Sequence, residues 1–387
     1  MSVTAARGFR AAGVAAGLKP SGGRDLALVV NDGPSHAAAG VFTTNRVKAA
    51  PVLWTRQVVD DGRTSAVVLN SGSANACTGS AGFQDAHATA EKVAGVLGLS
   101  AADVAVCSTG LIGERLPLDR LLAGVDAARG RLSRDGGIDA ADAIRTTDTV
   151  AKLSFRRGVG YTVGGMAKGA GMLAPGLATM LCVVTTDVAL PHRDLDAALR
   201  GATALTFDRL DTDGCMSTND TVLLLASGAS GATPSPDEFT ALVTEVCVDL
   251  ARQLVADAEG ATKEIAVEVV GAASEADALE VGRAVARSNL VKCAIHGEDP
   301  NWGRILAAVG TTRAVFEPDR LAVAVNGVWV CRSGVPAEDR AKVDLRPPDV
   351  SVTIDLGEGP RGGVAAATVL TTDLSAAYVH ENSAYST

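Results

Sequence analysis

Aromatic residues are scarce in this chain of 387 residues, which has three Trp, three Tyr and seven Phe. They make up 3% of the sequence, whereas apolar residues as a whole make up 47%. The core must therefore be built from Ala, Val and Leu. Apolar runs are also short, and none reaches the ~20 residues of a membrane span. Arg7 and Arg10 are not followed by a continuous apolar segment, so no signal peptide is expected.

The chain also lacks an excess of positive charge and any obvious set of metal ligands. Its formal net charge is −9, and a negative protein attracts neither nucleic acid nor an anionic membrane. The seven cysteines include no C-x-x-C pair and are odd in number, which is typical of reduced thiols in a cytoplasmic protein. The five histidines are dispersed, so a Ser/His/Asp triad has weak support, and neither a metal nor another cofactor is predicted.

The length exceeds the size at which one core stops growing, so two lobes or one large layered body is expected. Residues 1–60 are predicted to form a meander of short strands. Further strands are predicted at 65–70, 104–107, 180–184, 221–225, 263–270, 323–330, 350–355 and 365–370. Helices are predicted at 84–97, 138–146, 237–256 and 275–288. Since strands and helices are mixed throughout, the fold class is α/β or α+β.

The rest of the chain is organised around residues 164–187, GGMAKGAGMLAPGLATMLCVVTTD. This stretch begins with a glycine-rich run that contains one charge, Lys168, and is predicted to be a loop. A Pro-Gly turn at 175–176 follows, and Thr179 then opens an apolar run that is typical of a buried strand. If the chain is cut before Thr179, this residue becomes an N-terminal nucleophile. From the residues alone, an ordinary threonine at a strand start is the more common interpretation.

The segment KGAGMLAPGLATML resembles the self-cleavage segment of the ornithine acetyltransferase (glutamate N-acetyltransferase) family. The resemblance implies a cut between Ala178 and Thr179, and layered sheets flanked by helices as in N-terminal-nucleophile enzymes. Residues 1–178 then become an α chain and 179–387 a β chain, which stay associated, expected as an α2β2 heterotetramer. The likeness extends over the whole chain.

The same resemblance assigns the other site residues. In a C-S-T-G segment, Thr109 and Gly110 are expected to form the oxyanion hole. In a T-T-D-T segment, a threonine is expected to contact substrate, and the choice between Thr146 and Thr147 stays open. Lys168 is expected to bind a substrate carboxylate.

The family's E-G-A-T-K segment and its chain end complete the expected site. Glu259 is expected to bind the ammonium of ornithine, since a carboxylate suits a cation. Asn382 and the last residue, Thr387, are expected to reach the active site, although a tail of this composition is otherwise expected to be disordered. The H-G-E-D-P-N-W-G-R segment at 296–304 also matches a family pattern, and it is predicted to be a hydrogen-bonded loop without a catalytic role.

The implied reaction is ping-pong acetyl transfer from N-acetylornithine to glutamate in arginine biosynthesis. An α-amine ordinarily has a pKa of ~7.7–8.0, so the freed α-amine of Thr179 can serve as the base. Acetyl-CoA as a second donor stays open. So do a related role in a specialised pathway, an N-terminal-nucleophile amidohydrolase that uses water as the acceptor, and a non-enzymatic binding protein that stays uncut.

The predicted cut gives a direct test by intact mass. The wild-type protein should appear as two fragments, the second beginning Thr-Met-Leu-Cys. The variant Thr179→Ala should remain whole, because it lacks the hydroxyl that attacks the preceding peptide bond. Cleavage of that variant at the same bond contradicts the assignment of Thr179.

Overall fold

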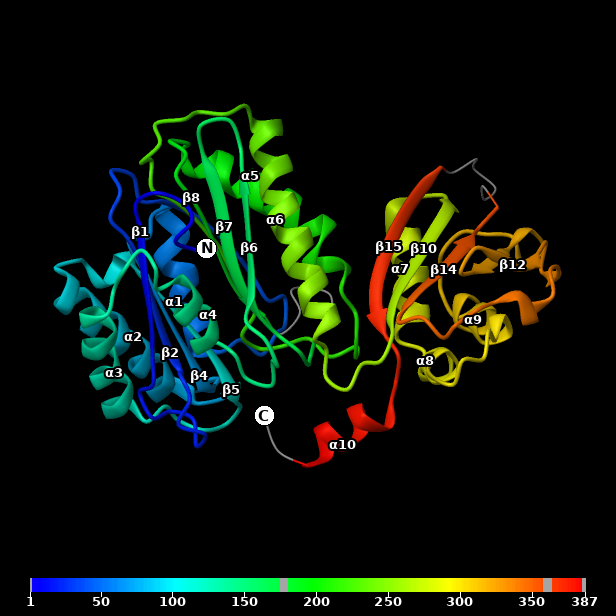
Figure 1. Cartoon of the computed structure of the whole chain (residues 1–387), viewed down its shortest axis with the longest axis horizontal. Helices are drawn as coiled ribbons and strands as arrows, with labels where there is room; N and C mark the ends of the chain where they lie inside the picture. Colours follow the sequence, from blue (N-terminus) through cyan, green and yellow to red (C-terminus); the bar gives the residue numbers. More distant parts are fainter. Residues whose placement is uncertain (1, 175–179, 358–363, 385–387) are drawn as a thin grey trace. The chain divides into compact units, whose positions relative to one another are not determined.

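The fold is described from a computed structural model, in which residues 2–174, 180–357 and 364–384 are described (Figure 1). The chain forms two compact units, and each is described by itself. The first unit contains residues 2–208 and 215–257, and the second contains residues 209–214 and 258–384. The border between the units therefore lies far along the chain from the predicted cut.

Two sheets form the centre of the first unit. The first has the order β1-β2-β4-β5, with β1 (Phe9–Val14), β2 (Leu26–Asn31), β4 (Ala66–Ser73) and β5 (Val104–Leu111). The second has the order β3-β9-β8-β7-β6, with β3 (Ala37–Phe42), β9 (Thr221–Ala226), β8 (Leu181–Thr186), β7 (Thr162–Lys168) and β6 (Lys152–Arg157).

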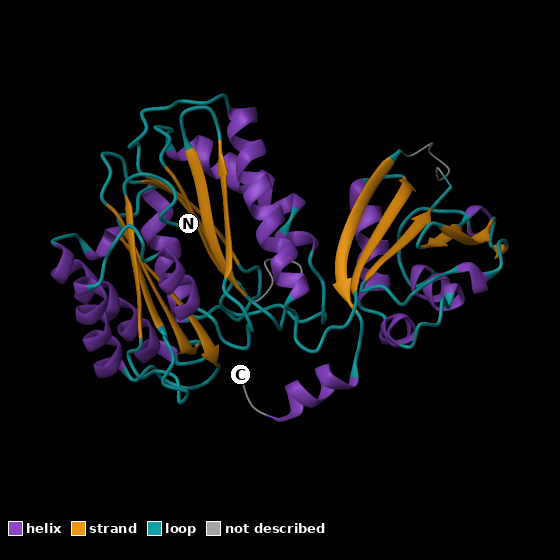
Figure 2. Cartoon of the chain, in the orientation of Figure 1, coloured by secondary structure: helices purple, strands orange, loops and turns teal. Residues whose placement is uncertain are grey.

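The side-chain alternation along β2 shows how the layers are built. Leu26 and Leu28 belong to a core cluster shared with helices α2 (Gly79–Leu97) and α3 (Leu118–Gly130). Ala27 belongs to a different cluster, which includes residues of β7, β8 and β9. Since successive strand residues point to opposite faces, the first sheet packs on helices with one face and on the second sheet with the other. Figure 2 shows helices flanking the paired sheets of this unit.

The remaining long helices of the unit cover the sheets or connect them. The set is α1 (Ala50–Val58), α4 (Gly137–Ala143), α5 (His192–Leu205) and α6 (Pro236–Ala256). Helix α6 starts with a capping box, in which the side chain of Ser235 accepts from the backbone of Glu238 and the side chain of Glu238 accepts in return. It packs along β6 and β7. Expected helices at 84–97, 138–146 and 237–256 therefore form, with ends shifted by a few residues.

The prediction of a loop for the glycine-rich run is wrong in its first part, because β7 extends through Gly164 and Gly165 to Lys168. The two glycines serve close packing. A Cβ on Gly164 would lie 2.2 Å from the carbonyl oxygen of Ser2, and one on Gly165 would lie 3.1 Å from Leu250 of α6. Glycine therefore lets other parts of the unit approach this strand on both faces.

Strand β8 forms as predicted and is buried over all six residues. It pairs antiparallel with β7 on one side and parallel with β9 on the other, and Lys168 lies opposite Leu181. The segment that contains the predicted cut thus leaves the sheet at the end of β7 and returns at the adjacent start of β8.

The prediction of a strand meander over residues 1–60 is wrong in two respects. Strand β3 joins the second sheet, next to β9, instead of following β2 in the first. Residues 50–58 form helix α1, which starts with Pro51 in its first turn, a favoured position for proline. Strand propensity alone did not reveal this switch between sheets.

The second unit is one mixed sheet with helices. Its order is β13-β12-β11-β14-β10-β15, with β10 (Glu264–Ala272), β11 (Ala322–Val325), β12 (Val328–Arg332), β13 (Val335–Pro336), β14 (Asp349–Asp355) and β15 (Ala365–Thr372). Its helices are α7 (Glu275–Ala286), α8 (Asn289–His296), α9 (Trp302–Val309) and α10 (Ala376–Ala384). Short 3-10 helices occur along the chain as η1 (Val59–Asp61), η2 (Ala101–Asp103), η3 (Phe207–Arg209), η4 (Pro318–Arg320) and η5 (Arg340–Lys342).

The core of this unit lies between one face of the sheet and helices α7, α8 and α9, as the shared buried cluster of Val, Ile and Ala residues shows. The predicted single strand at 323–330 is instead a hairpin, because Asn326 and Gly327 both adopt positive φ and turn the chain. The predicted loop at 296–304 is partly wrong as well, since helix α9 begins at Trp302 behind an Asn301 cap. None of the helices in the described ranges is long and apolar enough to cross a membrane.

The close approach at Gly164 predicts a large cost for any side chain there. Gly164→Ala should lower the free energy of unfolding by about 1–3 kcal/mol, because the new Cβ overlaps the Ser2 carbonyl. Denaturant unfolding measures this. The matched control is Gly95→Ala in α2, where a Cβ meets nothing within 4 Å and helix propensity favours Ala by roughly 1 kcal/mol. Equal behaviour of the two variants would contradict the packing role of Gly164.

Candidate active site

A buried cation, Lys168, lies at the end of β7 in the first unit, and its side chain is 2% exposed. Its Nζ donates to Thr146 Oγ1 at 2.7 Å and to Thr109 Oγ1 at 3.3 Å. A carboxylate oxygen of Asp148 lies 4.0 Å away. Lys168 therefore brings together two other residues that the sequence assigned to the site, each from a separate segment.

Thr109 and Gly110 lie near the end of β5, where this strand runs beside β4. Gly110 adopts φ +123°, and a Cβ there would lie 2.5 Å from the carbonyl carbon of Gly72. Only glycine fits this backbone conformation next to a neighbouring strand. The buried hydroxyl of Thr109 and the main chain of Gly110 thus occupy a fixed edge of the first sheet, beside the Lys168 ammonium.

Asp148 organises this cluster, although the sequence analysis gave it no role. Its Oδ1 accepts from the amide of Gly169 at 2.7 Å and from Lys152 Nζ at 2.7 Å. Its Oδ2 accepts from the amide of Thr146 at 3.0 Å. The carboxylate therefore fixes the residue that follows Lys168 as well as the main chain of Thr146. Its position inside T-T-D-T is the signal from which this role could have been inferred.

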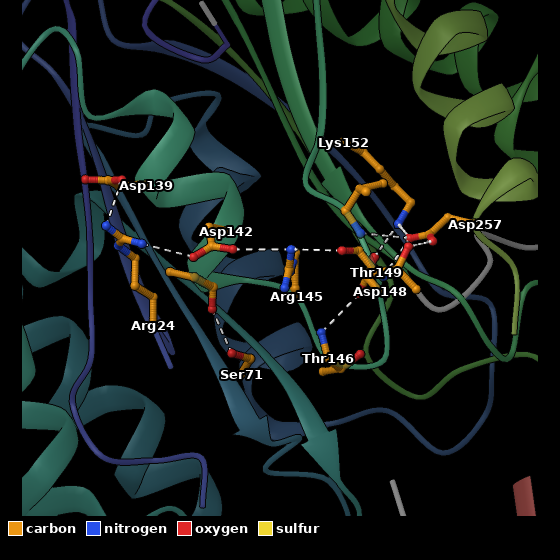
Figure 3. Close-up of polar contacts among 12 residues, drawn as sticks. Arg24, Ser71, Asp139, Asp142, Arg145, Thr146, Asp148, Thr149, Lys152 and Asp257 are labelled. Carbon is orange, nitrogen blue, oxygen red and sulfur yellow. Dashed lines mark hydrogen bonds and ion pairs between the residues drawn. The ribbon is translucent and has the colours of Figure 1, made fainter. Parts of the chain in front are cut away.

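A second carboxylate completes the charge compensation, as Figure 3 shows. Lys152 lies between Asp148 and Asp257, with its Nζ 2.6 Å from Asp257 Oδ2, and its side chain is fully buried. Asp257 follows the last turn of α6, where the helix dipole disfavours an acid. It also accepts from the amide and the hydroxyl of Thr149. These donors explain why an acid is found at this helix end.

Electrostatics keep Asp148 ionised. Burial by itself raises the pKa of this carboxyl, but the charges of Lys168 and Lys152 and the hydrogen bonds from Lys152 and Gly169 outweigh burial and lower its pKa to about 2. Asp148 is therefore a carboxylate at neutral pH, in contact with the buried Lys152 and 4.0 Å from Lys168. Such a balance lets one cation, Lys168, lie buried next to hydroxyl groups that can contact a substrate.

The surrounding ion pairs are more exposed and continue away from the cluster. Arg145 contacts Asp142 at 3.4 Å and the carbonyl oxygen of Thr149 at 3.2 Å (Figure 3). Asp142 in turn contacts Arg24 at 3.1 Å. Thr147 is half-buried and, within the ranges the structure describes, its hydroxyl makes no hydrogen bond. Of the two candidate threonines, Thr146 is the one that contacts Lys168.

Two further predicted residues meet in the second unit. Nδ2 of Asn382 in α10 donates to Glu259 Oε2 at 3.0 Å. Helix α10 is held nearby, because Ser375 Oγ donates to the carbonyl oxygen of Gly260 at 2.5 Å and a Cβ on Gly260 would lie 2.2 Å from the amide of Tyr378. The expectation of a disordered tail is therefore wrong for residues 376–384.

Three predicted site residues, Ala178, Thr179 and Thr387, lie outside the described residues. Among the residues that are described, no group of three or more His, Cys, Asp or Glu side chains could hold a metal ion. His296, at the end of α8, instead contacts Asp373 Oδ2 at 2.7 Å.

The chain is similar in sequence to a known protein family and to named relatives. The ArgJ family pattern matches residues 10–387. The arginine biosynthesis bifunctional protein ArgJ of Thermobifida fusca is 70% identical over 387 residues, and the match covers 100% of both chains. The protein of the same name from Streptomyces coelicolor is 66% identical over 386 residues, with 100% of both chains covered.

A solved structure is also similar in sequence. It is the ornithine acetyltransferase of Mycobacterium tuberculosis complexed with ornithine, which is 61% identical. The match covers 46% of this chain and 96% of that chain, with a TM-score of 0.45.

The charge balance around Asp148 predicts a strong effect of removing its charge. Asp148→Asn leaves Lys152 and Lys168 less compensated in a buried site, and it should lower the free energy of unfolding by about 3–5 kcal/mol at pH 7. In the wild type, the contribution of Asp148 is present above pH ~4 and is lost as the pH falls toward 2, because its folded pKa is below its unfolded value of ~3.9. Denaturant unfolding at several pH values measures both effects.

The matched control is Asp142→Asn, which also removes a carboxylate that contacts arginines but which is 32% exposed. Its loss should cost less than about 1 kcal/mol. Equal losses for the two variants would show that the buried charge balance is not what stabilises the site.

Proposed function

Because the chain belongs to the ArgJ family, we propose that it transfers an acetyl group from N-acetylornithine to glutamate in arginine biosynthesis. The products are ornithine and N-acetylglutamate, and the acetyl group passes through Thr179. The relatives are named bifunctional, which supports a second activity, the formation of N-acetylglutamate with acetyl-CoA as donor.

The observation that carries this proposal is the cluster of Lys168, Thr109 and Thr146. A buried ammonium next to two hydroxyls can hold a substrate carboxylate or stabilise a developing oxyanion. The cluster lies at the end of β7, and the residue opposite Lys168 on β8 is Leu181, two positions after Thr179. The proposed nucleophile at 179 is therefore two residues away, along the chain, from the strand β8 that pairs with the Lys168 strand β7.

In the proposed first half-reaction, the Thr179 hydroxyl oxygen attacks the acetyl carbon of N-acetylornithine. The Thr179 α-amine accepts the hydroxyl proton, and the Thr109 hydroxyl and the Gly110 amide bind the negative oxygen. The C–N bond then breaks, the amine returns the proton to the leaving nitrogen, and ornithine departs. In the second half-reaction, the amine nitrogen of glutamate attacks the ester carbon and the C–Oγ bond to Thr179 breaks. The Thr179 α-amine accepts a proton from the attacking nitrogen and passes it to Oγ, which gives N-acetylglutamate and free Thr179.

Glu259 and Asn382 are proposed to bind the ornithine part of the substrate, as the family resemblance implies. A carboxylate held by an amide donor is suited to the ammonium group of ornithine. Thr387, five residues beyond Asn382, is proposed to join it through its hydroxyl or its terminal carboxylate. Self-cleavage involves only the bond between residues 178 and 179, so these residues act in turnover and not in processing.

The proposed cut is compatible with a stable pair of chains. Strand β7 precedes the cut and β8 follows it, and the two are paired along their length. The α and β chains therefore share one sheet after cleavage. An assembly of two such pairs, α2β2, is proposed for the complete enzyme.

Ping-pong transfer predicts an exchange reaction that a single-step mechanism cannot perform. With N-acetylornithine and labelled ornithine but no glutamate, label should enter N-acetylornithine, because the acetylated enzyme can react backwards with ornithine. Thin-layer or mass analysis measures this exchange, and the control Thr179→Ala should show none.

Two outcomes separate the alternatives. Label exchange without acetyl transfer to glutamate, together with release of acetate, would identify an amidohydrolase. Acetyl transfer that requires glutamate at every step, with no exchange, would contradict the acetyl-Thr179 intermediate.

A further inference from the structure

The segment 217–221, which leads into β9, holds both backbone groups of Met180, the residue directly after Thr179. Asp220 Oδ1 accepts from the Met180 amide at 3.0 Å. The Met180 carbonyl oxygen accepts from the amide of Thr221 at 3.1 Å. Met180 is the first described residue after the stretch 175–179. Its amide is bonded by the side chain of Asp220 and not by a carbonyl oxygen of a described neighbouring strand.

Asp220 itself is fixed. It is fully buried, and its carbonyl oxygen accepts from the amide of Thr43 at 2.9 Å. The hydroxyl of Thr43 donates to the carbonyl oxygen of Ser217 at 2.7 Å, which closes the turn around Asp220. These contacts fix the main chain of Asp220, from which its carboxyl group reaches the Met180 amide.

The adjacent residue, Asn219, contacts β5, the strand that carries Thr109 and Gly110. Its Nδ2 donates to the carbonyl oxygen of Ser108 at 2.8 Å and to that of Ala74 at 2.6 Å. Ser108 directly precedes Thr109 on β5. Two consecutive residues thus connect the strand that carries the oxyanion candidates with the first peptide group after the nucleophile.

We propose that Asp220 is a positioning residue, which holds the Met180 amide and thereby the main chain that follows the proposed nucleophile. The proposal rests on the proposed function, since it takes Thr179 as the nucleophile. Asn219 supplies the matching contact on the β5 side. Productive acyl transfer requires the reacting atoms to approach within about 3–3.5 Å, so a small displacement of the nucleophile costs much of the rate.

The role of Asp220 is that of a hydrogen-bond acceptor rather than a charge. Burial raises the pKa of Asp220 well above its usual value, although the Met180 amide and the charge of Lys168 oppose this shift. In either protonation state the carboxyl group keeps an oxygen that accepts from the Met180 amide. Asn offers an oxygen of the same geometry, so Asp220→Asn should preserve the contact whereas Asp220→Ala removes it.

The experiment compares these two variants in the full chain, with Thr185→Ala as the matched control. Thr185 lies on β8, the strand that Met180 precedes, and its variant loses a buried hydrogen bond, from Thr185 Oγ1 to the Val3 carbonyl oxygen at 2.7 Å. Rates of self-cleavage, kcat and KM for acetyl transfer, and melting temperatures are measured for each. Asp220→Ala should lower kcat by about ten- to a hundredfold with KM changed less than about threefold. Asp220→Asn should stay within about threefold of wild type.

Each alternative result overturns the proposal. Wild-type kcat in Asp220→Ala would show that the contact positions nothing. An equal loss in Asp220→Asn would mean that charge, not acceptor geometry, is required. If Thr185→Ala lowers kcat as much as Asp220→Ala at a similar loss of melting temperature, the effect is one of general stability.

A second readout does not depend on any reaction. Labelling with ¹⁵N-methionine gives few amide signals, because the chain has five methionines, and Met180→Leu identifies the Met180 signal. In Asp220→Ala this amide should exchange with deuterium at least about tenfold faster than in the wild type. Unchanged exchange overturns the proposal even in an active enzyme. An inactive, uncut wild type with normal Met180 protection would instead reject the proposed function.

Discussion

The compensation of buried charge around Asp148 is the constraint on which the candidate site depends. Lys168 can lie 2% exposed because a carboxylate is 4.0 Å away, and Asp148 stays ionised because Lys152 also contacts it. Lys152 in turn needs Asp257 at the end of α6. A single buried cation, Lys168, thus requires a chain of three further charges, which connects the loop at 146–149, the sheet and a helix end.

The sequence predicted much of this site because its segments are distinctive. The family is confirmed, and the described strands and helices confirm the mixed α and β fold class. Thr109, Thr146 and Lys168 do come together, and Glu259 contacts Asn382. The assigned roles of these residues remain predictions. They came from the resemblance, since each segment by itself is an ordinary turn or strand end.

The features that the sequence did not predict are those that depend on contacts between segments far apart in the chain. Gly164 and Gly165 suggested a loop, and their place inside β7 follows only from the approach of Ser2 and α6. Asp148 and Asp220 were overlooked because their partners, such as Lys152 and Met180, are determined by the folded sheets and not by spacing. Helix α1 was missed for the same reason, since its place is set by the switch of β3 from one sheet to the other.

The position of β8 between β7 and β9 has a consequence for refolding after denaturation. One neighbour, β7, precedes the proposed cut and the other, β9, follows it. The uncut precursor closes the β7–β8 pair as an intramolecular loop, whose entropic cost does not depend on protein concentration. Two separated chains must first meet by diffusion, so recovery of a cut protein becomes a second-order association that fails on dilution. The proposed cleavage, if it follows folding, would therefore leave a protein whose fold is maintained by its barrier to unfolding.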